Sequence, residues 1–158
     1  MKRDAWIDGD AAALLQGLAG AWALERRIAD RRAGEAGTFS GRAVFTPDAD
    51  GLRYREAGGL RLPGRPALQA ERVYLWRAAA GWIDVRFDDG RPFHRFAPPS
   101  AGDGGAGPDA PHLCGRDLYQ VRYAFESGSS WSAVWEVRGP RKDYRLVSHY
   151  TRAASGQG

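Results

Sequence analysis

Apolar and polar residues alternate along most of this chain with a period of two residues. In the run that follows Asp117, the rings of Tyr119, Tyr123 and Phe125 share one parity, and mostly polar residues occupy the other. Successive side chains of a β-strand point to opposite faces of the sheet, so this run predicts a strand with one aromatic face. Similar runs predict about nine strands, near residues 22–28, 39–45, 52–60, 68–76, 83–87, 93–96, 117–125, 131–137 and 144–152.

Residues 10–19 show the only clear helical pattern. Leu14, Leu15 and Leu18 give this segment an apolar side, Asp10 is a suitable N-cap, and Gly20 can end the helix. The sequence therefore predicts one short helix ahead of the strands.

Short turn sequences such as Asp89-Gly90 join consecutive strands, which indicates antiparallel pairing. Sheets of this size close on themselves or split into two layers to avoid open edges. We therefore predict an all-β fold, an antiparallel up-and-down calycin-like barrel, with a β-sandwich as the alternative. One domain is expected over residues 1–158, with the barrel over 20–152.

Residues 98–111 are rich in glycine, proline and alanine. Such a composition buries little apolar surface, so this segment is expected to be a flexible loop between the sixth and seventh long strands. Its position suggests a lid over the open end of the barrel.

Composition and charge narrow the function classes. The formal net charge is +4, but the basic residues are scattered and form no block, so a nucleic-acid partner is not expected. A single cysteine fits a reducing cytoplasm. No secretory signal or membrane helix is recognisable. We expect a cytoplasmic protein without a membrane partner, either a monomer or a homodimer.

Gly20-Ala21-Trp22 after the helix resembles the start of the calycins, which include lipocalins, fatty-acid-binding proteins and nitrobindins. The resemblance implies that Trp22 packs at the closed end of the barrel under Arg152, near the end of the last strand. A guanidinium stacks well on an indole face, so these two residues are expected to close the barrel.

A fuller set of motifs resembles a calycin-like family called domain of unknown function 6314. The motifs are Glu25–Arg27, Phe39–Gly41, Tyr54–Glu56, Arg72–Trp76, Phe87–His94, His112–Cys114 with Asp117–Tyr119, and Trp135–Tyr144. The similarity spans about residues 20–152. It implies the fold and carries no activity, so the site has to be argued from the residues.

Several ionisable groups share the inward parity of the rings: Arg26, Glu56, Arg72, Asp117 and, in one register of its strand, His94. A buried charge is costly unless it is paired. Glu56 and Arg72 are expected to pair across neighbouring strands, and Asp117 is expected to pair with Arg26, His94 or the turn backbone. These groups form either a structural ion-pair network or a polar ligand site.

The function predicted is binding of a small, partly apolar, anionic molecule inside the barrel. Arg26 and Arg72 supply the charge. The expected walls are Tyr74, Trp76, Tyr119, Tyr123, Trp131 and Trp135.

Two other functions stay open. One is an enzyme that uses His94, Asp117 and Glu56 for acid–base isomerisation, cyclisation or decarboxylation in the same cavity. The other is a protein–protein module whose barrel is filled by its own side chains. A cavity in the interior would favour ligand binding or the enzyme over the protein–protein module.

No cofactor is expected from the spacing of possible ligands. His112 and Cys114 are weak candidates for a metal site, because they match no standard zinc pattern. Haem held by one histidine, His94 or His112, is the alternative that the nitrobindin resemblance implies. The sequence assigns no role to Cys114.

Overall fold

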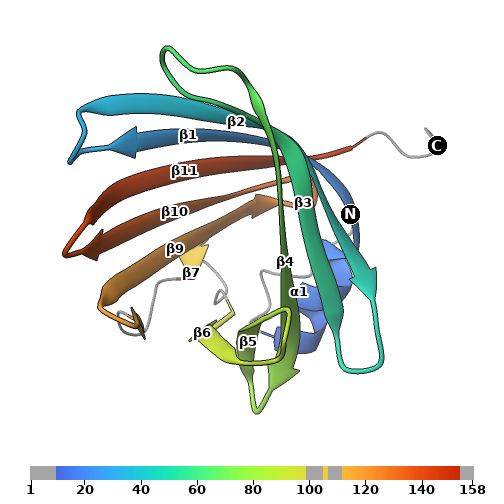
Figure 1. Cartoon of the computed structure of the whole chain (residues 1–158). Helices are drawn as coiled ribbons and strands as arrows, with labels where there is room; N and C mark the ends of the chain where they lie inside the picture. Colours follow the sequence, from blue (N-terminus) through green and yellow to red (C-terminus); the bar gives the residue numbers. More distant parts are fainter. Residues whose placement is uncertain (1–9, 99–104, 107–111, 154–158) are drawn as a thin grey trace.

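The computed structural model describes residues 10–98, 105–106 and 112–153. These residues form one short helix and one large antiparallel sheet that curls into a nearly closed barrel (Figure 1). The elements are α1 (Ala11–Leu18), β1 (Gly20–Asp30), β2 (Glu35–Pro47), β3 (Leu52–Arg61), β4 (Leu68–Ala79), β5 (Trp82–Phe87), β6 (Pro92–Phe96), β7 (Gly105–Ala106), β8 (His112–Cys114), β9 (Asp117–Ser127), β10 (Ser130–Gly139) and β11 (Lys142–Arg152).

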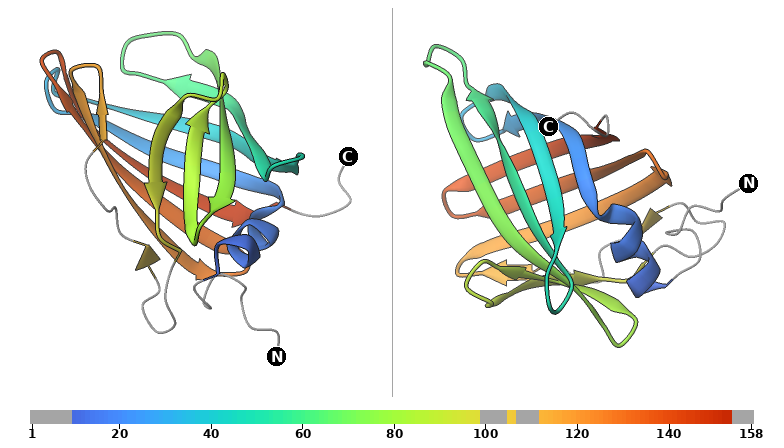
Figure 2. Two further views of the ribbon diagram at one scale, coloured as in Figure 1. Left: turned by 90° about the horizontal axis from the view of Figure 1, so that it is seen from below. Right: turned by 90° about the vertical axis from the view of Figure 1, so that its right-hand side faces the viewer.

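The strand order is β6-β5-β4-β3-β2-β1-β11-β10-β9-β7, and β8 also pairs with β9. All nine predicted long strands are present, so the up-and-down barrel is confirmed and the sandwich is excluded. Two views from other directions show how the sheet wraps around its interior (Figure 2). Among the described residues, no helix has the length and apolar character needed to cross a bilayer.

The structure corrects the prediction for the segment before β9. Residues 105–106 form β7 within the expected loop 98–111, and residues 112–114, for which no strand was predicted, form β8. Cys114 pairs with Asp117, and Gly115 takes a φ of 65° in the tight turn between β8 and β9. A left-handed φ favours glycine, which explains the short hairpin. The rest of the predicted loop, 99–104 and 107–111, lies outside the described residues.

The sheet ends at β6 on one side and at β9 with its short partners on the other. In the described part of the chain, β6 and β9 are not paired by backbone hydrogen bonds. Side chains bridge this seam: the rings of Phe96 and Tyr123 lie 4.4 Å apart, and the Phe93 ring lies 5.5 Å from that of Tyr119. The barrel is therefore closed by aromatic packing at this one boundary.

The helix, the start of β1 and the end of β11 close one end of the barrel. Asp10 caps α1 by accepting hydrogen bonds from the backbone N–H groups of Ala12 and Ala13. Trp22 is fully buried, and its indole N–H donates to the Leu18 carbonyl at 2.9 Å. The guanidinium carbon of Arg152 lies 3.9 Å from the centre of the Trp22 ring. The same guanidinium donates to the carbonyls of Ala19 and Gly17.

Candidate functional site

The barrel contains a cavity of about 140 Å³ with aromatic walls. A dry cavity of about 150 Å³ in another protein accommodates benzene, so this space suits a single ring. Its walls include all eight side chains that the sequence predicted as ligand contacts: Arg26, Arg72, Tyr74, Trp76, Tyr119, Tyr123, Trp131 and Trp135. The cavity argues against an interior filled by the protein's own side chains.

The sequence prediction missed four further aromatic residues of the wall, namely Tyr54, Phe87, Phe93 and Tyr150. Tyr54 and Tyr150 share the inward parity of the chosen residues, so their strands carried the signal. Phe93 had no such signal, because alternation turns it to the face opposite His94, whereas in the structure both residues line the cavity. The reason is a β-bulge, described below.

Arg26 and Glu56 form a buried ion pair on one wall. Nη1 of Arg26 donates to Oε2 of Glu56 at 2.7 Å, and Nη2 donates to Oε1 at 2.9 Å. Nε of Arg26 donates to the Ser148 hydroxyl at 2.7 Å. The predicted pairing of Glu56 with Arg72 is therefore corrected. The two residues do lie opposite each other on β3 and β4, but the carboxylate bonds in bidentate fashion to Arg26 from β1.

Two tyrosines complete this network. Tyr54 donates its hydroxyl proton to Oε1 of Glu56 at 2.6 Å, so the bond of 3.0 Å between the Tyr54 and Tyr150 hydroxyls needs Tyr150 as the donor. The Tyr150 oxygen in turn accepts from Arg26 at 3.4 Å. Each hydroxyl proton is used within the network, which stabilises the barrel wall.

The network shifts the pKa values of its members. Burial would raise the pKa of Glu56, but the hydrogen bonds and positive charge of Arg26 outweigh burial and hold that pKa below its usual range. Burial raises the pKa of the Tyr54 and Tyr150 hydroxyls, which stay protonated. Glu56 is thus a fixed anion neutralised by Arg26, and it is a weak candidate for a general base.

Arg72 is the second cation of the cavity wall. Its side chain is exposed, and among the described residues no carboxylate forms an ion pair with it. The ionisable side chains on the wall, apart from histidine, cysteine and tyrosine, are Arg26, Glu56 and Arg72. Because Arg26 and Glu56 neutralise each other, Arg72 leaves an excess positive charge beside an aromatic cavity.

His94 lies inside the barrel, where it lines the cavity and is only 4% exposed. Its Nε2 forms a hydrogen bond of 3.0 Å with the Tyr123 hydroxyl across the seam between β6 and β9. Burial raises the pKa of that hydroxyl, so Tyr123 remains a neutral phenol. The pair therefore places an imidazole and a phenol side by side on the cavity wall.

Asp117 lies away from this pair. Its Oδ2 is 3.0 Å from Nζ of Lys142 on β11. The hydrogen bond to Asp117 raises the pKa of Lys142. The predicted pairing of Asp117 with Arg26 or His94 is wrong, because Asp117 is at the start of β9 next to the β10–β11 turn. The three predicted catalytic residues are not brought together as one acid–base group.

Metal and haem binding receive little support from the geometry. Within the described ranges, no three His, Cys, Asp or Glu side chains are grouped as metal ligands. Cys114 is exposed at the cavity wall, and the side chain of His112 lies outside the described residues. A cavity of about 140 Å³ matches one benzene ring and is too small for a tetrapyrrole. The residues at this cavity do not fit haem.

Comparison with known proteins supports the fold. The model of a family of unknown function, DUF6314, matches residues 18–152, which confirms the resemblance predicted from the motifs. No curated protein matches the sequence.

Similar solved structures include a lyase and a protein of unknown function. The S-type phycobiliprotein lyase CpeS from Guillardia theta has a TM-score of 0.65 and 10% identity over 92% of this chain and 94% of that chain. A protein of unknown function from the DUF3598 family of Nostoc punctiforme has a TM-score of 0.57 and 10% identity over 88% of this chain. This chain spans 49% of the length of that protein. At such identities the likeness shows the calycin-like fold alone.

Proposed function

The chain belongs to the DUF6314 family, whose function is unknown, and we propose from the cavity that it binds a small, partly apolar, anionic molecule. One observation carries the proposal: an aromatic cavity whose wall holds two guanidinium groups and one carboxylate. The apolar part of the ligand fills the cavity, and its anionic group pairs with Arg72 at the exposed side of β4.

The roles of the two arginines differ. Arg26 uses its donors on Glu56, Ser148 and Tyr150, so it holds the wall in place. Arg72 has its guanidinium available, and a bidentate contact with a carboxylate is a strong charge-assisted interaction. Specificity for anions should therefore depend on Arg72.

Titration with benzoate, followed by quenching of tryptophan fluorescence, tests this assignment. Removing a hydrogen-bonded charge costs about 1.5–3 kcal/mol, so Arg72→Ala should weaken benzoate binding about 10- to 100-fold. The variant should bind uncharged benzyl alcohol as the parent does. Arg53→Ala removes an exposed arginine from the outer face of β3 and is the matched control. Equal benzoate affinity in the parent and in Arg72→Ala would contradict the proposal.

A second candidate function rests on the bond between His94 and Tyr123. An imidazole and a phenol 3.0 Å apart in a buried cavity can pass a proton to and from a bound molecule, as an isomerase needs. The probe is phenylpyruvate, whose keto–enol conversion moves one proton from carbon to oxygen. His94→Gln and Tyr123→Phe should lower kcat while circular dichroism shows both variants folded at the assay temperature, and Asp117→Asn should have no effect. Equal rates with and without the protein would exclude this activity for the probe.

A further inference from the structure

Phe93 reaches the cavity because of an irregularity in the β5–β6 hairpin. Val85 pairs with His94, and Arg86 pairs with Pro92, so Phe93 is an extra residue with no partner on β5. Such a β-bulge changes the direction of a side chain that regular pleating would turn outward. As a result, the consecutive residues Phe93 and His94 both line the cavity.

The ring of Phe93 contacts rings on both sides of the seam between β6 and β9. On the β4–β5 side, its centroid lies 4.6 Å from that of Phe87 and 5.7 Å from that of Tyr74. On the β9–β10 side, it lies 5.5 Å from Trp135, with only 4° between the planes, and 5.5 Å from Tyr119. One side chain therefore spans two walls that are not joined by strand pairing in the described part of the sheet.

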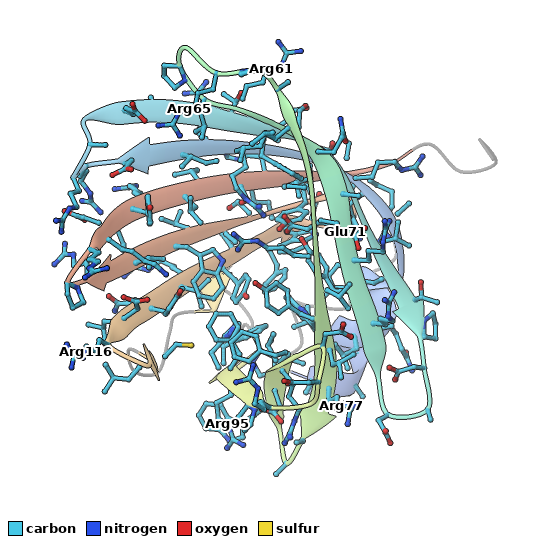
Figure 3. The ribbon with its side chains drawn as sticks, in the orientation of Figure 1. Arg61, Arg65, Glu71, Arg77, Arg95 and Arg116 are labelled. Atoms are coloured by element: carbon cyan, nitrogen blue, oxygen red, sulfur yellow. The ribbon has the colours of Figure 1, made fainter. Side chains whose placement is uncertain are left out.

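Stacked and edge-to-face ring contacts at these distances are favourable, and here they surround a single ring on both sides. The charged side chains labelled in Figure 3, such as Arg65 and Arg116, lie on the outside of the barrel. Phe93 therefore fills the space between these two walls.

We propose that Phe93 is the residue that sets the size of the ligand, so that this site accepts an anion with one aromatic ring and rejects one with two fused rings. This deepens the function proposed above and rests on it. Larger aromatic ligands normally bind apolar pockets more tightly, because they bury more apolar area. A preference for the smaller ring is therefore a specific sign of a steric limit.

Calorimetric titration of the full chain with benzoate and 2-naphthoate tests the size limit. The parent should bind benzoate at least about tenfold more tightly than 2-naphthoate, and Phe93→Ala should reverse this order. Trp82→Ala is the matched control: it removes a ring of the same β5–β6 hairpin that does not line the cavity, so it should keep the parent's preference. Phe93→Leu takes the place of the alanine variant if that variant does not fold.

Two results would overturn the size limit: a parent that binds 2-naphthoate as tightly as benzoate, or a Phe93 variant with the parent's ratio of affinities. A parent that binds neither anion would instead contradict the proposed function. In that case, the affinities of the uncharged ligands benzyl alcohol and 2-naphthalenemethanol would test the size limit, because their binding does not depend on Arg72.

Discussion

At the scale of single residues, the partner of Glu56 defines which charges are structural. The carboxylate takes both hydrogen bonds from Arg26, and this pair is largely excluded from water, with side chains 11% and 4% exposed. Two charges in such surroundings stabilise each other, but each would be costly alone. The pair therefore behaves as one neutral unit of the wall.

Removing one member of this pair should destabilise the fold more than removing both members. Arg26→Leu leaves Glu56 buried without its counter-ion and should lower the free energy of unfolding by about 3–5 kcal/mol. The double variant Arg26→Met with Glu56→Leu removes both charges and should recover most of that loss. Urea denaturation of the three proteins measures the difference. A double variant as unstable as the single one would show that the charges themselves stabilise the barrel.

Acid should weaken the fold through the same carboxylate. The pKa of Glu56 is lowered in the folded state, so its contribution to stability is present above the pKa of the unfolded chain and is lost as the pH falls through the folded pKa. Between pH 6 and pH 3, the parent should lose more unfolding free energy than Glu56→Gln. Glu71→Gln, which removes an exposed carboxylate, is the control. Parallel pH profiles for the parent and Glu56→Gln would contradict this reasoning.

The sequence predicted which side chains face inward more successfully than it predicted their partners. Strand parity places Arg26, Glu56 and Arg72 on one face, whatever the details of packing. The partner of Glu56 depends on the curvature of the barrel, which brings β1 and β3 together across β2. A pairing rule between adjacent strands therefore favoured Arg72, although the bond goes to Arg26.

At the scale of strands, one glycine pair permits close contact between β2 and β3. Gly41 and Gly58 lie opposite each other, and a Cβ added to either would come within 2.2 Å of a backbone oxygen of the neighbouring strand. Such contacts require glycine, because no side chain can relieve them. The two strands can therefore bend around the interior at this point.

Alanine substitutions in β3 test this requirement within one strand. Gly58→Ala should lower the free energy of unfolding by about 1–3 kcal/mol, as inserted atoms do in a packed interior. Gly59→Ala is its neighbour and control, because an added Cβ there meets no atom within 4 Å. Thermal unfolding should separate the two variants. Equal melting temperatures would mean that the close approach relaxes without cost.

The β5–β6 bulge marks the limit of prediction at this scale. Alternation predicts that Phe93 and His94 point to opposite faces, and a bulge breaks that rule by one residue. Within Phe87–Phe96, the sequence predicts the turn at Asp89-Gly90 but does not indicate the position of the extra residue. The fold was predictable from the repeated pattern, whereas the shape of the cavity depended on this single exception.

At the scale of the whole molecule, Arg152 joins the end of the last strand to the segment before the first. Its guanidinium donates to the carbonyls of Gly17, Ala19 and Gly128 and covers the ring of Trp22. The resemblance to calycins indicated this arrangement at the level of sequence, because both residues lie at fixed places near the ends of the barrel. These contacts hold α1 against the closed end.

Losing that guanidinium should loosen the closed end. Arg152→Ala is expected to lower the free energy of unfolding by about 1–3 kcal/mol, since it removes charged hydrogen bonds and a cation–π contact. Arg152→Lys keeps the charge but loses the planar fork and should recover only part of this loss. Chemical denaturation gives the values. An Arg152→Ala variant as stable as the parent would show that α1 is held by its leucines alone.

The central claim is that an aromatic anion binds inside the barrel, and the indole N–H signals of the tryptophans test it most directly. Trp76, Trp131 and Trp135 line the cavity, whereas Trp22 lies at the closed end and Trp82 lies beside Arg95. Nuclear magnetic resonance spectra recorded during a benzoate titration, with signals assigned by Trp→Phe variants, should show saturable shifts for the three cavity indoles and little change for Trp22 and Trp82. Saturable shifts confined to Trp82, or no saturable shift at any indole, would contradict binding in the cavity.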